Sequence, residues 1–141
     1  MKQLRLFSFA SLALFMAACA GPLTDPAVLM DYDALAEGLR EAGAQVEPAG
    51  EIEQPFFSVG GMLIHVSGQD VQVFEYTDVA SRQADSDQIS ADGSSIGTSM
   101  VTWVDQPNFW AQGLLIVLYV GQDAGTTDLL RGVLGQPITK S

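Results

Sequence analysis

The sequence holds a single cysteine, a single histidine and only six basic residues among 141. One thiol cannot form a disulfide within the chain, and one imidazole excludes a histidine-rich metal site built from one copy of it. The 17 acidic residues give a formal net charge of −11. Such a charge repels phosphate backbones and therefore argues against nucleic-acid binding. We expect a domain that folds without disulfides and does not bind nucleic acid.

The N-terminal residues are typical of an export signal. Two basic residues, Lys2 and Arg5, precede an apolar run over residues 6–15, and small residues surround Cys19. The run is too short for a transmembrane helix, which needs roughly 20 apolar residues. Residues 16–19 (MAAC) resemble a bacterial lipobox, in which the cysteine becomes the lipidated first residue of the mature chain. We predict a signal peptide over residues 1–18 and lipidation of Cys19.

The processing site leaves two localisations open. Lipidation places the protein in the bacterial cell envelope, anchored to a membrane through Cys19. Ala20 stands where an aspartate would resemble a signal for inner-membrane retention, so the outer membrane is favoured in a host with two membranes. The alternative is ordinary cleavage, since Ala18 and Ala20 satisfy the Ala-x-Ala rule and would release a soluble secreted or periplasmic protein.

A tether and one domain follow the signal. Residues 19–30 contain two prolines and a glycine close together, which disfavours helix and strand, and we place a single domain over residues 31–141. Apolar spacing predicts helices capped by Asp31 and Thr77 and a third over residues 127–134. Strands are predicted over residues 56–59, 62–66, 71–76, 101–104 and 114–120, with an extended segment from Val46. This order predicts an α+β fold, with an antiparallel sheet of about five or six strands and two or three helices packed on it.

Two patterns point toward catalysis or metal binding, and each lacks a required part. Residues 93–97 (GSSIG) match the Gly-x-Ser-x-Gly of a nucleophile elbow, but the only histidine, His65, precedes Ser95, and no strand–turn–helix pattern surrounds the serine. A calcium loop starting at Asp85 would place isoleucines where ligands are needed. We therefore predict no catalytic residue, no metal and no cofactor. A small hydrolase using Ser95 and His65 is the alternative.

Large aromatic residues are the remaining candidates for contacts with a ligand or partner. Phe56 and Phe57 are adjacent and would point to opposite faces of a strand, so only one of them enters a one-sided core. Phe109 and Trp110 follow Pro107 in or near a loop, where exposed rings would serve binding. We predict a non-catalytic domain that binds an envelope protein or small ligand through Phe56, Phe109 and Trp110. Core packing of these rings, or a purely structural envelope protein, are the alternatives.

Five segments carry a resemblance to a known group of proteins. They are residues 39–46 (LREAGAQV), 54–59 (QPFFSV), 71–76 (VQVFEY), 92–97 (DGSSIG) and 115–121 (LIVLYVG). Together they resemble a family of small bacterial lipoproteins of unknown function, in which a signal peptide with a lipobox precedes one α+β domain. The resemblance implies export and lipid anchoring. It implies no activity and no catalytic residue.

Overall fold

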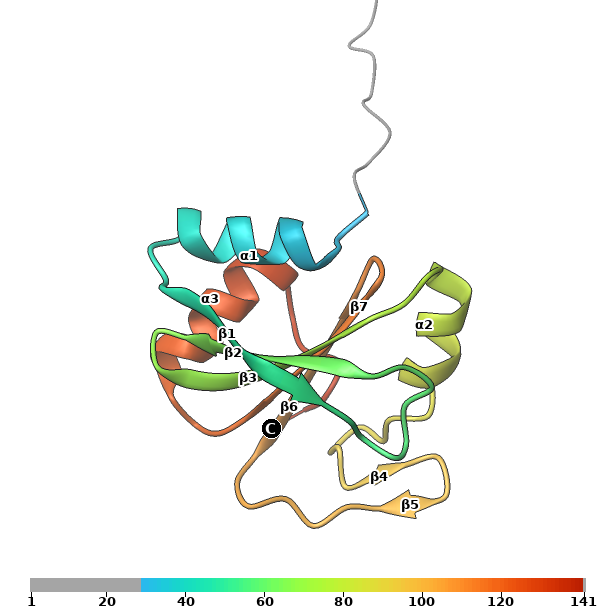
Figure 1. Ribbon diagram of the computed structural model, residues 1–141. Helices are drawn as coiled ribbons and strands as arrows, with labels where there is room; N and C mark the ends of the chain where they lie inside the picture. The colour runs from blue at the N-terminus through green and yellow to red at the C-terminus, as the bar shows by residue number, and fades with distance from the viewer. Residues whose placement is uncertain (1–28, 141) are drawn as a thin grey trace, which may run out of the picture.

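The computed structural model describes residues 29–140, so the predicted signal peptide, Cys19 and most of the tether lie outside the described residues. The helices are α1 (Tyr32–Glu41), α2 (Val79–Ser86) and α3 (Ala124–Leu134). The strands are β1 (Val46–Ile52), β2 (Gly61–Val66), β3 (Gln69–Glu75), β4 (Ser95–Ile96), β5 (Ser99–Met100), β6 (Pro107–Gln112) and β7 (Leu115–Val120). Five strands form one antiparallel sheet in the order β1-β2-β3-β7-β6, and β4 and β5 form a separate hairpin (Figure 1). The predicted α+β class is confirmed.

Each helix begins at an aspartate whose carboxylate accepts a hydrogen bond from a backbone N–H of the first turn, as expected at an N-cap. The bonds run from Ala34 to Asp31 (2.8 Å), from Ser81 to Asp78 (2.7 Å) and from Thr126 to Asp123 (2.8 Å). The cap at Asp31 is the predicted one. Thr77 is not the cap of α2, because the carboxylate of Asp78 takes that role. α3 also begins earlier than predicted, since Asp123 caps it.

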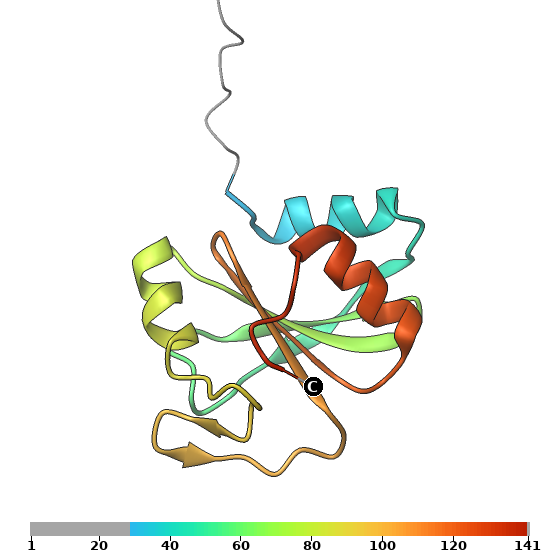
Figure 2. The same cartoon turned by 180° about the vertical axis from the view of Figure 1, so that it is seen from behind.

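The large sheet is apolar on both faces, because alternate side chains of a strand point in opposite directions. Along β3, Val71 and Val73 face one core cluster, whereas Phe74 faces the other. β7 is buried on both faces, as its unbroken apolar run predicts. α1 and α3 lie side by side over the first face (Figure 2). The helix residues buried against this face are Leu35, Ala36, Leu39, Leu130 and Leu134.

Irregular segments cover much of the second face, and this overturns two of the predicted strands. Residues 56–59 form a turn-rich loop between β1 and β2, in which the Phe57 ring packs 4.7 Å from that of Phe74. Residues 101–104 are irregular as well, and Trp103 is held by a 2.7 Å bond from its indole N–H to the Gly93 carbonyl. In both segments the aromatic side chains that suggested strands pack against the rest of the domain. The backbone of these segments does not pair with a strand of the sheet.

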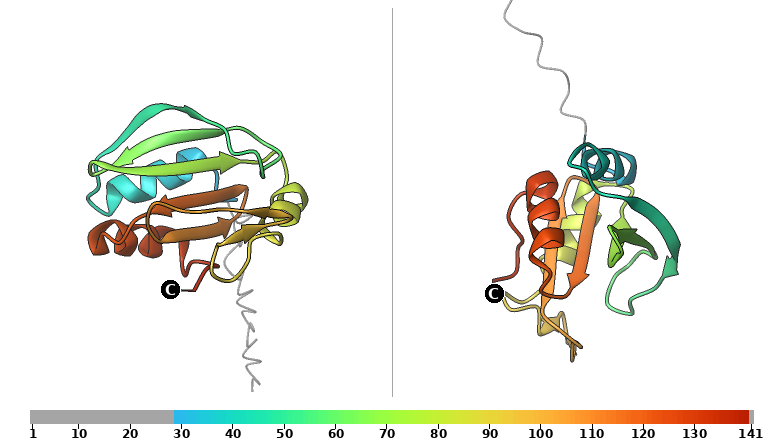
Figure 3. Two further views of the ribbon diagram at one scale, coloured as in Figure 1. Left: turned by 90° about the horizontal axis from the view of Figure 1, so that it is seen from below. Right: turned by 90° about the vertical axis from the view of Figure 1, so that its left-hand side faces the viewer.

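The two edges of the sheet differ in how they are protected (Figure 3). The outer edge of β6 is covered by C-terminal residues, since Ile138 N donates to the Phe109 carbonyl at 2.7 Å. At the other edge, β1 is highly exposed, carries glutamates, and shifts register between Pro48 and Gly50. Proline, charge and a bulge all discourage pairing with a further strand. Within residues 29–140, no helix has the length and apolar composition needed to cross a membrane.

Candidate ligand-binding groove

One end of the helix-covered face of the sheet lies open beside the start of α1. A groove of about 480 Å³ forms there, where β1 and β3 end and β2 begins. Its apolar surface comes from Tyr32 of α1, Ile52 of β1, Met62 of β2 and Val73 of β3. Val73 belongs to the core cluster under the helices, Tyr32 and Met62 pack against that cluster, and Ile52 packs against the other one. Met62 and Val73 are direct cross-strand partners. The groove is therefore a continuation of the main core that no helix covers, and its size is typical of a ligand site.

Three glutamates surround this apolar surface. Glu51 pairs across the strands with Met62, Glu53 follows the end of β1, and Glu75 ends β3. All three are exposed. Among residues 29–140, the only ion pair within 4.0 Å joins His65 and Asp70, so no basic side chain of the described residues neutralises the groove carboxylates. The site combines an apolar floor with a rim of uncompensated negative charge.

Two adjacent glycines form the wall of the groove at the start of β2, and they differ in the space around them. A Cβ at Gly61 would lie 2.6 Å from the Phe74 ring, so the packing of the second core requires glycine there. A Cβ at Gly60 would have nothing within 4 Å, and Gly60 has no positive φ. Gly60 lines the groove, and a Cβ added there meets no neighbouring atom of the core.

The loop that carries Gly60 is held in place by the buried carboxylate of Asp85 in α2. This carboxylate accepts hydrogen bonds from the Ser58 backbone N–H (2.7 Å), the Ser58 hydroxyl (2.7 Å) and the Tyr76 hydroxyl (2.8 Å). α2 is itself fixed by Arg82, whose Nε donates to the Gly113 carbonyl at 3.0 Å. The groove wall is thus connected through one acceptor to α2 and to Tyr76, the residue after β3, which fixes the wall in place without a ligand.

The ionisation of this network follows from its geometry. Burial alone would raise the pKa of Asp85, but the hydrogen bonds from Ser58 and Tyr76 outweigh burial and lower it below its usual range. Burial and the hydrogen bond to Asp85 raise the pKa of Tyr76 well above its ordinary value. At neutral pH the pair is therefore a phenol donating to a carboxylate. This contact links α2 to the residue that follows β3.

The structure contradicts the predicted contact role of Phe109 and Trp110. Both lie in β6, where Phe109 is 0% and Trp110 is 1% exposed. As neighbours in a strand they point to opposite faces, so one ring enters each core cluster. Phe56 is half-buried and packs edge-on against Phe57, with ring centres 4.9 Å apart. For Phe109 and Trp110 the alternative of core packing is correct.

The residues of the alternative hydrolase lie on different elements that the structure does not bring together. His65 lies in β2, and its Nε2 is 3.1 Å from Asp70 across the β2–β3 hairpin. Ser95 lies in β4, beyond α2, and its backbone N–H donates to Ser90 Oγ at 3.0 Å. The loop around Ser95 is organised by Asp92, which accepts hydrogen bonds from the Ser94 backbone N–H and from two serine hydroxyls. These bonds lower the pKa of Asp92 to about 2.

Acidic residues elsewhere do not converge on a metal site within the described part of the chain. Over residues 29–140, no group of three or more histidine, cysteine, aspartate or glutamate side chains has an arrangement that could hold a metal ion. Asp85, the start of the calcium-like pattern, has its carboxylate turned to Ser58 and Tyr76. The three groove glutamates likewise form no such group.

The groove was not predicted from the sequence, although the sequence contains one signal for it. Strand alternation places Glu75 on the same face as Val71 and Val73. A carboxylate at the end of an otherwise apolar face indicates that the face is open to water at that point. Tyr32 and Glu51 gave no comparable signal, because their approach to the end of β3 depends on how α1 and β1 pack on the sheet.

Comparisons with protein-family models, with curated proteins and with solved structures found no match for this chain. The resemblance to small bacterial lipoproteins therefore stays a prediction from the sequence.

Proposed function

We propose that the chain is an envelope lipoprotein, anchored to a membrane through Cys19, whose domain binds a ligand or partner in the groove and performs no catalysis. The observation that carries the proposal is the groove itself, which extends the apolar core at Met62 and Val73 to the surface and is bordered by exposed carboxylates. A concave surface that combines apolar side chains with a few polar groups is typical of a ligand-binding site.

The position of the groove agrees with an anchored binding role. Tyr32 lines it and lies only a few residues after Leu29, the first residue described. The segment from Cys19 to Leu29 can span at most about 35 Å when fully extended. A ligand in the groove would therefore lie within a few tens of ångströms of the anchoring membrane, which favours another envelope component as the occupant.

Site-specific photo-crosslinking in cells tests this function. A photoreactive amino acid is introduced at residue 60, in the groove wall, and separately at residue 132, an exposed position of α3. Both are glycines at which an added Cβ meets nothing within 4 Å, so both variants are expected to fold. We expect a covalent adduct in the membrane fraction from position 60 and none from position 132. Equal labelling at the two positions, or none at position 60, would reject the groove as the binding site.

A further inference from the structure

We propose that the groove binds a basic segment of a partner protein, with a lysine or arginine side chain laid along its apolar floor and the charged group held among Glu51, Glu53 and Glu75. This inference deepens the function proposed above and rests on it. It specifies the chemistry of the occupant, which the groove's existence alone leaves open.

Charge supports a cationic occupant. The three groove carboxylates have no basic partner within 4.0 Å among residues 29–140. A bound cation would relieve their mutual repulsion, whereas a phosphate or carboxylate ligand would add to it. A purely apolar ligand would draw the carboxylates out of water with nothing to replace their hydration. Among these classes, a cation is the only one for which the rim contributes favourably.

Shape supports a cation attached to an apolar stem. Lysine and arginine bury their methylene chains on apolar surface while the charged group stays at the polar rim. Met62 and Val73 offer that surface, and the half-buried ring of Tyr32 borders it, where a cation can also contact an aromatic face. A volume of about 480 Å³ exceeds one side chain and accommodates a short peptide stretch.

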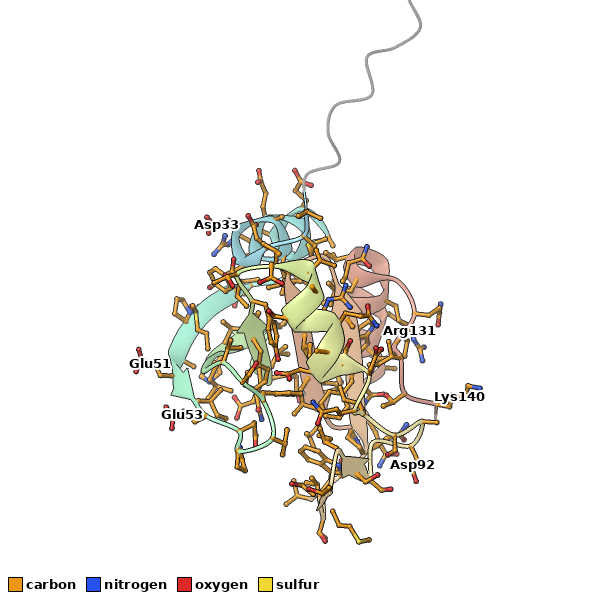
Figure 4. The ribbon with its side chains drawn as sticks, turned by 90° about the vertical axis from the view of Figure 1, so that its right-hand side faces the viewer. Asp33, Glu51, Glu53, Asp92, Arg131 and Lys140 are labelled. Atoms are coloured by element: carbon orange, nitrogen blue, oxygen red, sulfur yellow. The ribbon has the colours of Figure 1, made fainter. Side chains whose placement is uncertain are left out.

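The distribution of charge beyond the groove supports a macromolecular partner. Figure 4 shows Asp33, Glu51 and Glu53 on one side of the molecule and Arg131 and Lys140 on the other, where Asp92 also lies. The acidic side thus extends from the groove onto α1. Exposed ion pairs contribute only about 0.2–1 kcal/mol each, so a single free amine would bind weakly. A segment with several basic residues gains from the groove and from the wider acidic surface, which also speeds association.

Peptide binding to the full-length protein in detergent tests the inference. The probe is a short fluorescent peptide of alternating lysine and leucine, measured by anisotropy beside matched peptides of glutamate and leucine and of lysine and serine. We expect the lysine–leucine peptide to bind most tightly, the lysine–serine peptide more weakly and the glutamate–leucine peptide not at all. Added salt should weaken binding, because the rim is exposed to solvent.

Two sets of protein variants locate the contact. The double variant Glu53→Gln/Glu75→Gln should weaken binding about ten-fold. The control Glu47→Gln/Asp128→Asn removes the same charge outside the groove and should change affinity less than about two-fold. Gly60→Trp should abolish binding by filling the groove, whereas Gly132→Trp should not. Thermal unfolding of each variant checks that it is folded.

The outcomes separate the inference from the function on which it rests. Absence of binding by the lysine–leucine peptide, equal binding of the glutamate–leucine peptide, or equal effects of the two double variants would overturn the basic occupant. If the probe at residue 60 still forms an adduct in cells, the groove remains a binding site for another class of ligand. If the probe forms no adduct, the proposed function itself is wrong.

Discussion

Replacing Asp85 with alanine is expected to lower the free energy of unfolding by about 3 kcal/mol, because buried donors lose their acceptor. The Ser58 backbone N–H and the Tyr76 hydroxyl both donate to this carboxylate at 2.8 Å or less, and Asp85 is 8% exposed. Urea denaturation monitored by circular dichroism measures the change. Asp87→Ala, at the exposed C-cap of α2, is the control and should change stability little.

The ionisation of Asp85 makes part of the free energy of unfolding depend on pH, and this part is lost at low pH. The folded-state pKa of Asp85 is lowered from an unfolded value of about 3.9. Its contribution is therefore present above about pH 4 and is lost as the pH falls through the lower folded-state pKa. Other aspartates with lowered pKa values, such as Asp92 and Asp123, act in the same direction.

The difference in the free energy of unfolding between wild type and Asp85→Asn, measured at each pH, isolates the contribution of Asp85. Stability measured from neutral pH down to acid should fall less steeply in Asp85→Asn, because asparagine does not titrate. Parallel stability curves for the two proteins would show that the pKa of Asp85 is the same in the folded and unfolded states, which would contradict the lowered folded-state pKa.

Trp110→Ala is expected to lower the free energy of unfolding by about 3–5 kcal/mol, the largest effect of a single substitution in this set. The ring is 1% exposed, pairs across strands with Val117, and donates from its indole nitrogen to the Gly135 carbonyl at 3.0 Å. Alanine would leave a cavity in the core under α1 and α3 and would remove the hydrogen bond to Gly135 at the end of α3. Equilibrium unfolding in urea measures the loss.

Trp103→Ala serves as the comparison, because Trp103 is half-buried at the other face. It should cost clearly less than Trp110→Ala. If Trp110→Ala unfolded at the same urea concentration as wild type, the ring would not contribute to the core, and this account of β6 would be wrong.

The elements that were predicted correctly from the sequence are those with a strong local pattern. The apolar run of β7 can be buried on both faces only within a sheet, and Asp31 marks the start of an amphipathic helix. β6 was missed because Pro107 and the aromatic pair that follows resemble a loop. Its strand conformation comes from pairing with β7 and from the C-terminal residues that cover its outer edge.

The candidate site was harder to predict because its parts are distant in the chain. Tyr32, Glu51 and Glu75 converge only after α1 packs on the sheet and β1 pairs with β2. The sequence predicts Phe109 and Trp110 as contacts with a ligand or partner. In this fold their rings fill the two cores instead. The groove instead uses residues whose types are common on any protein surface, and only their positions in the fold distinguish them.

Membrane fractionation of cells that express the wild type or Cys19→Ser tests the central claim, that Cys19 anchors this binding domain to a membrane. We expect the wild type in the membrane fraction and Cys19→Ser in the soluble fraction. Thr24→Ala, in the predicted tether, should fractionate like the wild type. Soluble behaviour of both wild type and Cys19→Ser, or membrane association of both, would contradict an anchor at Cys19.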